Sequence, residues 1–164
     1  MSNLEFKTDP YELWQMLATG TCLEHGCEFI LHKHAEDQTE ATPKQLAALK
    51  LAASLDDSFQ NLMDDAAEQF RAWVDSRVDL SSEGLGGISR ANIRDHYRIY
   101  QVRIPRQDGD SLHYFLDCGC DWEEEHNMTM LVRDMNIVFC GQYDCRSDWW
   151  AMEREIAEYQ SRKL

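Results

Sequence analysis

The sequence predicts an α+β fold, in which helices pack on one face of a small antiparallel β-sheet and a C-terminal helix closes the chain. Apolar residues recur every three or four positions in the first half of the chain, which is typical of helices. Four short apolar runs in the second half are separated by brief turns, which is typical of strands. The 164 residues fit one domain, 1–164, with a helical first half over about 9–80, a sheet over about 97–142 and a closing helix over about 147–162.

The first element is predicted to be a helix, because Asp9 can cap it, Pro10 suits its first turn and Gly20 can end it. Residues 27–34, "CEFILHKH", follow as a short strand of apolar and aromatic residues.

The strongest helical pattern covers residues 43–78. Thr42 and Gln45 can form a capping box, Pro43 takes the first helical position, and the polar residues 56–58 break or restart the helix. One apolar stripe is expected to be buried: Leu55, Phe59, Leu62, Ala66, Phe70 and Trp73. The acids expected on the opposite, solvated face are Asp57, Asp64, Asp65 and Glu68.

The second half begins with a glycine-rich loop over 81–89, and Ser89 can cap a short helix that runs to His96. Strands are predicted at 97–105, 112–118, 128–134 and 136–142, and their short connections favour an antiparallel meander. Ser147 can cap the last helix, whose apolar face carries Trp149, Met152, Ile156 and Tyr159.

Charge and composition limit the classes of partner. The formal charge of −14 should repel nucleic acids and anionic membranes and attract a basic protein. The first residues lack an export signal and no apolar run is long enough to span a bilayer, so a cytoplasmic location is expected. In that compartment the six cysteines are expected to be thiols or metal ligands.

The stretch "CGCDWEEEH", residues 118–126, has three interpretations. As a structural zinc site it would use four thiolates, from Cys118, Cys120, Cys140 and Cys145. Their C-x-C and C-x4-C spacings differ from the usual pairs of C-x2-C, so no cofactor is favoured and zinc stays the alternative. A weaker candidate set is Cys22, His25 and Cys27.

As a catalytic cluster, the stretch offers Asp121, Glu123, Glu125 and His126 for acid–base chemistry. Crowding of these carboxylates would raise their pKa values and could attract a divalent cation. No nucleophile with an adjacent base is evident elsewhere, so we do not expect an enzyme. As a structural connection, Trp122 would pack under the helices and His126 would hydrogen-bond across the connection while the acids face water.

The run "FLDCGCDWEEEHNMTMLVRDMNIVFCGQYD" resembles the end of a bacterial domain family of unknown function, and the resemblance covers about residues 40–144. The family motif is Trp-acid-x-Glu-His before a C-terminal hairpin, and it corresponds here to Asp121, Trp122, Glu123, Glu125, His126 and Gly141. Asn127 stands where the family has glycine, and asparagine tolerates the same left-handed backbone. The resemblance implies no reaction, but some members are encoded among toxin–immunity clusters.

The function expected from these observations is that of a non-enzymatic, soluble bacterial binding protein, with an immunity protein that neutralises a basic toxin as its specific form. The expected partner surfaces are the helix acids Asp57, Asp64, Asp65 and Glu68 and the loop acids Glu123 and Glu125. A zinc-stabilised or metal-dependent domain centred on residues 118–126 is the alternative. The sequence leaves the oligomeric state open.

Overall fold

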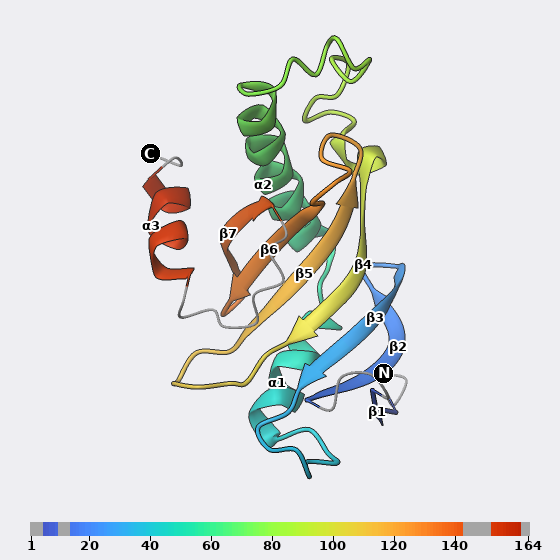
Figure 1. Cartoon of the computed structure of the whole chain (residues 1–164), viewed down its shortest axis with the longest axis vertical. Helices are drawn as coiled ribbons and strands as arrows, with labels where there is room; N and C mark the ends of the chain where they lie inside the picture. Colours follow the sequence, from blue (N-terminus) through green and yellow to red (C-terminus); the bar gives the residue numbers. More distant parts are fainter. Residues whose placement is uncertain (1–4, 10–13, 143–151, 162–164) are drawn as a thin grey trace.

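The computed structural model describes residues 5–9, 14–142 and 152–161. A seven-stranded sheet forms the middle of the molecule, and its strands lie side by side in the order of the chain (Figure 1). The strands are β1 (Lys7–Thr8), β2 (Gln15–Cys22), β3 (His25–His32), β4 (Tyr97–Ile104), β5 (His113–Cys120), β6 (Met128–Arg133) and β7 (Asn136–Gln142). With the helices, this sheet confirms the predicted α+β class.

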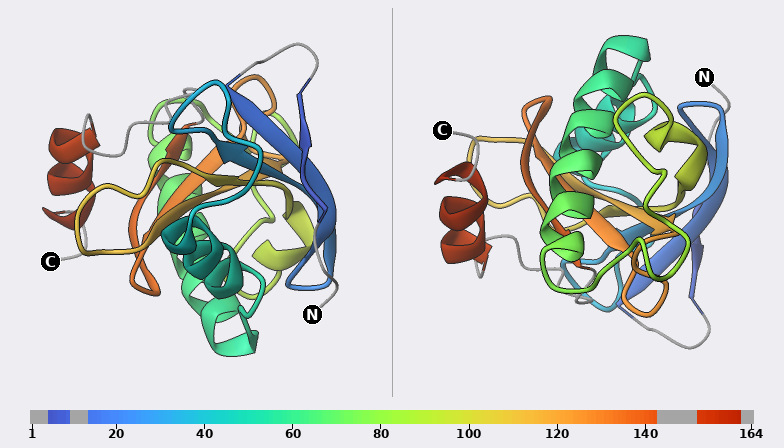
Figure 2. Two further views of the ribbon diagram at one scale, coloured as in Figure 1. Left: turned by 90° about the horizontal axis from the view of Figure 1, so that it is seen from below. Right: turned by 90° about the horizontal axis from the view of Figure 1, so that it is seen from above.

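Two helices, α1 (Pro43–Ala52) and α2 (Asp57–Asp75), cover one face of the sheet (Figure 2). α1 packs on β4 and β5, whereas α2 packs on β7 and on the short 3-10 helix η1 (Ile93–His96). The closing helix α3 (Glu153–Ser161) lies beside the edge strand β7 (Figure 1). Ile156 and Tyr159 of this helix and Met152 just before it are buried as predicted, while Ser147 and Trp149 lie outside the described residues.

The helix predicted over 9–20 is wrong where the structure describes this segment, because Gln15–Cys22 is strand β2. Met16, Ala18 and Cys22 are buried on alternate positions, and the strand pairs along its whole length with β3. The turn between them uses Leu23 and Glu24, both in the left-handed region with φ of 48° and 66°. A two-residue turn of this kind joins adjacent antiparallel strands, and its long-range pairing overrides the local helical pattern.

The helical pattern over 43–78 is confirmed, with a break between α1 and α2. Thr42 and Gln45 form the predicted capping box, and Asp56 caps α2 by accepting a hydrogen bond from the Phe59 amide. The predicted stripe is partly wrong, because Leu62 is 48% exposed. The apolar side chains of α2 that face the core are Phe59, Met63, Ala66, Ala67, Phe70 and Val74.

The sheet contains one parallel pair, β3 with β4, which the predicted antiparallel meander did not include. The long connection through α1 and α2 returns the chain to the same end of the sheet before β4 begins. Such a crossover is what parallel neighbours require, whereas short connections leave the remaining pairs antiparallel. The meander from β4 to β7 is therefore correct, and only its junction with β3 differs.

Strand β5 lies at the centre of the sheet's second half and is buried on both faces. On the helix face, Leu116 pairs across the sheet with Val102 and Met130. On the opposite face, Asp117 accepts hydrogen bonds from Arg103 (Nη2 to Oδ1, 2.9 Å) and from the Thr129 hydroxyl. These bonds of the Asp117 carboxylate join β5 to β4 and β6 and help to fix the register of the three strands.

Candidate functional site

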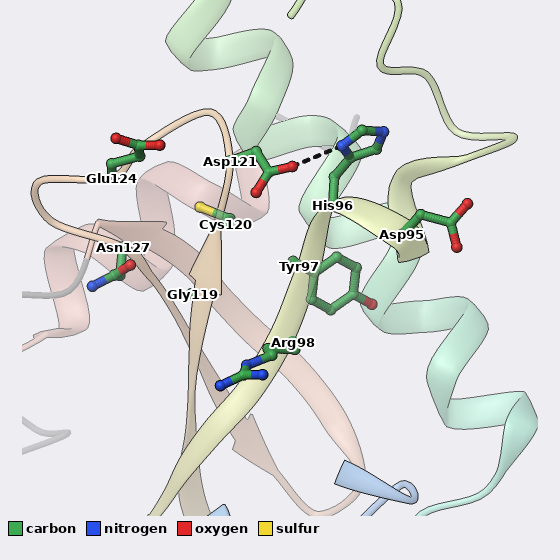
Figure 3. A pocket seen from close by; sticks show the side chains of 9 residues that line it. All are labelled: Asp95, His96, Tyr97, Arg98, Gly119, Cys120, Asp121, Glu124 and Asn127. Atoms are coloured by element: carbon green, nitrogen blue, oxygen red, sulfur yellow. Dashed lines mark hydrogen bonds and ion pairs between the residues drawn. The ribbon is translucent and has the colours of Figure 1, made fainter.

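A pocket of about 420 Å³ opens where β4 begins and β5 ends. The two strands are antiparallel, so residues 96–98 at the start of β4 lie opposite residues 119–121 at the end of β5. The residues that line the pocket come from η1, β4, β5 and the β5–β6 connection (Figure 3): Asp95, His96, Tyr97, Arg98, Gly119, Cys120, Asp121, Glu124 and Asn127. This volume falls within the range of about 300–1,000 Å³ that is usual for ligand pockets.

His96 and Asp121 join the two strand ends at the upper side of this pocket. The His96 Nδ1 atom lies 2.9 Å from Asp121 Oδ2, and the Asp121 amide donates to the His96 carbonyl at 3.0 Å. The Asp121 side chain is still 56% exposed, so the carboxylate remains accessible to a ligand. The carboxylate of Glu124 lies farther along the same connection and is also exposed (Figure 3).

Arg98 and Gly119 form the lower side of the pocket. They are direct partners across β4 and β5, and Arg98 has no carboxylate partner among the described residues. A Cβ atom at Gly119 would meet nothing closer than the Asn127 Oδ1 atom at 3.8 Å. Because Gly119 has no side chain, the space between Arg98 and the two carboxylates stays open (Figure 3).

The β5–β6 connection is held by Glu123. Its Oε1 atom lies 3.1 Å from His126 Nδ1, and its Oε2 atom accepts from Gln142 Nε2 at 3.0 Å. Burial opposes ionisation of Glu123, but the hydrogen bonds from Gln142 and His126 outweigh it and lower the pKa of this carboxyl. The predicted rise in pKa by crowding of the acids is therefore wrong for Glu123. His126 bonds within the connection as the structural interpretation predicted.

Asn127 ends the connection in the left-handed region with φ of 57°, as the substitution of asparagine for glycine predicted. Its amide donates to the Glu123 carbonyl at 2.8 Å, which closes one turn around the acids.

Trp122 and Gly141 have packing roles. Trp122 is 3% exposed and meets Tyr97 edge to face, with 6.4 Å between the ring centroids. A Cβ atom at Gly141 would lie 2.6 Å from the Phe139 ring, so a larger residue there would displace that ring. Gly141 pairs with Thr129 in the β6–β7 hairpin, and Glu125 is exposed on the connection.

The acidic helix face differs from the prediction at Asp64, which is 1% exposed. Its carboxylate accepts from Arg94 Nη2 at 2.8 Å, from the Tyr97 hydroxyl at 2.7 Å and from Gln60 Nε2 at 3.0 Å. Burial opposes the charge, but these donors outweigh it and lower the pKa of Asp64. Asp64 therefore holds η1 and β4 against α2 and is not a partner surface.

The other three acids of that helix face are only partly available. Asp65 is paired with Arg90, and Glu68 receives two hydrogen bonds from Arg71. Asp57 is exposed. None of the four lines the pocket, and neither do the predicted loop acids Glu123 and Glu125, whereas Glu124 between them does.

The cysteines do not gather around one point in the described residues. Cys118 and Cys120 are buried free thiols, Cys140 is also buried, and Cys145 lies outside the described residues. Burial raises the pKa of Cys118 well above its usual value and that of Cys120 to about 12, so both thiols are protonated at neutral pH. Within the described chain, no three side chains of His, Cys, Asp or Glu are placed to hold a metal ion together. The Cys22 thiol donates to the Ala52 carbonyl, and His25 Nδ1 accepts from the Ile99 amide at 2.9 Å.

Sequence reasoning missed Asp95, His96 and Arg98, which join the predicted Asp121 at one site. The available signal was the strand pattern itself, because an antiparallel pair formed by 97–105 and 112–118 places the start of one strand beside the end of the other. The register that brings His96 beside Asp121 could not be predicted from the short loop that joins the two strands.

The site thus belongs to an α+β domain with a polar pocket at the end of the sheet where β4 begins and β5 ends. Residues 4–147 match the model of a family described as a domain of unknown function, DUF6985, and the chain belongs to this family. The match begins well before residue 40, where the expected resemblance began, and includes β1 to β3. Comparisons with curated proteins and with solved structures find no significant match. In the described residues, no helix is both long and apolar enough to cross a membrane.

Proposed function

We propose that the chain is a non-enzymatic binding protein that recognises a basic protein through the acidic groups at this pocket. The observation that supports this most directly is the placement of Asp121 and Glu124, two exposed carboxylates, on the wall of a concave site. Glu125 is exposed beside them on the same connection. A concave acidic site on a chain of charge −14 favours approach of a cationic surface and repels an anionic one.

The specific form of this proposal is an immunity role, in which the basic partner is a toxin that the chain neutralises. Binding would then cover the toxin's cationic substrate surface, and the chain would need rigidity at the contact rather than catalytic groups. The connection supplies such rigidity, because Glu123 ties it to His126 and Gln142 and Trp122 anchors it from below.

Charge reversal at the connection tests the proposal. The double substitution Glu124→Lys and Glu125→Lys should weaken binding of the basic partner by about tenfold at low salt, since each exposed pair contributes up to about 1 kcal/mol. The measurement is capture of basic proteins from cells that encode the chain, followed by the dissociation constant of the purified pair at two salt concentrations.

The matched control is Glu36→Lys with Glu40→Lys, which makes the same change of charge in the loop between β3 and α1, at the other end of the molecule (Figure 1). Both exchanged pairs are exposed and change the net charge equally. If the control weakens binding as much as the substitutions at the connection, the pocket is not the interface and only the overall charge matters.

The alternative of a zinc-stabilised domain has its own test. Elemental analysis of the purified full-length chain, including Cys145, should find less than stoichiometric zinc if the thiols are packing residues. Zinc near one atom per chain, with loss of stability on chelation, would replace the present proposal by the metal-dependent one.

A further inference from the structure

The pocket is lined by a positive group, Arg98, as well as by three carboxylates, of which Asp121 and Glu124 lie together whereas Asp95 points away from them (Figure 3). Arg98 lies opposite Gly119, and Asp121 and Glu124 lie at the other side (Figure 3). A ligand with only a cation would gain from the carboxylates but would be repelled by Arg98, which no described carboxylate neutralises. A ligand that carries a cation and an anion a few atoms apart would satisfy both sides.

We propose that this pocket binds the C-terminal lysine or arginine of a protein partner, with its side-chain cation on Asp121 and Glu124 and its terminal carboxylate on Arg98. The inference rests on the proposed function and narrows it to one chemical feature of the basic partner. A single terminal residue carries both charges, and guanidinium–carboxylate pairs form two parallel hydrogen bonds. Capture of a C-terminal carboxylate is an established mode of peptide recognition, and here a guanidinium would take the place of the backbone N–H groups that usually bind it.

Gly119 is the residue that makes this possible. A side chain at this position would point into open space between Arg98 and Asn127, since the nearest atom to a built Cβ is 3.8 Å away. It would therefore fill the pocket without disturbing the core of the sheet. The pairing of His96 with Asp121 keeps one carboxylate oriented at the pocket's upper side.

The experiment uses the full chain and three short peptides, followed by NMR titration at low salt. The probes are acetyl-Gly-Gly-Arg with a free carboxylate, the same peptide with a C-terminal amide, and acetyl-Gly-Gly-Ala with a free carboxylate. We expect the first to bind with a dissociation constant of about 1 mM and the other two at least about fivefold more weakly, because each lacks one charge-assisted contact. Equal binding of the free and amidated arginine peptides would overturn the inference.

Two variants identify the groups. Arg98→Gln should weaken binding of the free arginine peptide and remove its advantage over the amide, whose own binding should be unchanged or tighter because the repulsion by Arg98 is lost. Gly119→Leu should prevent binding of every probe, whereas Gly26→Leu should not. Gly26 is a matched control, because it is also a strand glycine with space for a side chain and it does not line the pocket; a Cβ built on Gly26 has nothing within 4 Å. Should Arg98→Gln keep the preference for the free carboxylate, the assignment to Arg98 is wrong.

Failure of this inference and failure of the proposed function give different results. If no peptide binds but the Lys substitutions at 124 and 125 still weaken binding of a basic partner selectively, the pocket does not bind a chain terminus. The proposal of an acidic interface is then supported on its own. If the free arginine peptide binds with the expected preference and no selective effect of charge reversal on a basic partner is found, the basic-protein proposal fails while the pocket's recognition of a terminal arginine stands.

Discussion

At the scale of single residues, Asp64 shows how one buried carboxylate holds two parts of the fold together. It lies on α2, and its donors come from α2 itself, from η1 and from β4. The carboxylate is nearly inaccessible, whereas Arg94 is half exposed, so the charge on Asp64 depends on its neighbours more than theirs depends on it. The same contacts position the β4 end that carries the pocket residue Arg98.

Replacement of Asp64 should therefore cost much more stability than replacement of its neighbour. We expect Asp64→Ala to lower the free energy of unfolding by about 3 kcal/mol, because the Tyr97 hydroxyl and Gln60 lose their buried acceptor. Asp65→Ala should cost less than about 1 kcal/mol, since Asp65 is 60% exposed and pairs only at the surface. Urea unfolding at pH 7 measures both, and similar losses would contradict the assigned role.

The pH dependence of the Asp64 contribution follows from its lowered pKa. The folded state releases this proton more readily than the unfolded chain, whose carboxyl has its ordinary value of 3.8. The stabilisation is therefore complete above that value and is lost as the pH falls through the lower pKa of the folded state.

His113 should act in a different pH range. Burial lowers the pKa of its imidazole from 6.5 to about 4, although hydrogen bonds with the backbone partly oppose this. Between these values the unfolded state binds more protons than the folded state, so stability falls as the pH is lowered from 6.5 to 4, by about 3 kcal/mol in total. His113→Gln cannot ionise and should remove most of this slope in urea unfolding at several pH values. An unchanged slope in the variant would assign the effect to other groups.

At the scale of elements, the two two-residue hairpin turns are built from residues that rarely favour them. Leu23 and Glu24 join β2 to β3, and Asp134 and Met135 join β6 to β7, all with positive φ. Asn-Gly and Asp-Gly are the usual sequences for such turns. Only Asp134 matches that preference. For this reason the sequence predicted the β6–β7 hairpin but not the β2–β3 hairpin.

Substitution of glycine in the first turn should stabilise the fold. Glu24 is exposed and has φ of 66°, so Glu24→Gly relieves a left-handed conformation and should raise the free energy of unfolding by about 0.5–1 kcal/mol. The comparison is Glu28→Gly in strand β3, where extended backbone gives glycine no advantage and stability should fall. Thermal unfolding distinguishes the two, and destabilisation by Glu24→Gly would contradict the strain argument.

The sequence predicted the elements whose signal is local. The capping box of Thr42 and Gln45, the break near Asp56 and the four strands of the second half depend on neighbours within a few positions. The pairing of Asp64 with Arg94, 30 residues away, and of His96 with Asp121, 25 residues away, depends on how the elements pack. For that reason the sequence identified Asp121 as a site residue and missed the pocket around it.

At the scale of the whole molecule, the charge of −14 has opposite consequences for stability and for binding. Repulsion among excess carboxylates destabilises the compact chain, whereas attraction to a basic partner increases with the same charge. Dissolved salt screens both effects, because the Debye length falls from about 30 Å at 0.01 M to about 8 Å at 0.15 M.

We therefore expect the melting temperature to rise, and the affinity for the basic partner to fall, when sodium chloride is raised from about 0.01 M to about 0.15 M. The triple variant Glu36→Gln, Asp37→Asn and Glu40→Gln changes the charge from −14 to −14 + 3 = −11 without touching the pocket. It should start from a higher melting temperature at low salt, respond less to added salt and keep the pocket's preference among ligands. A melting temperature that does not respond to salt in either protein would show that the surface charges are already balanced locally, as Asp65 with Arg90 and Glu68 with Arg71 are, and that net charge does not control stability here.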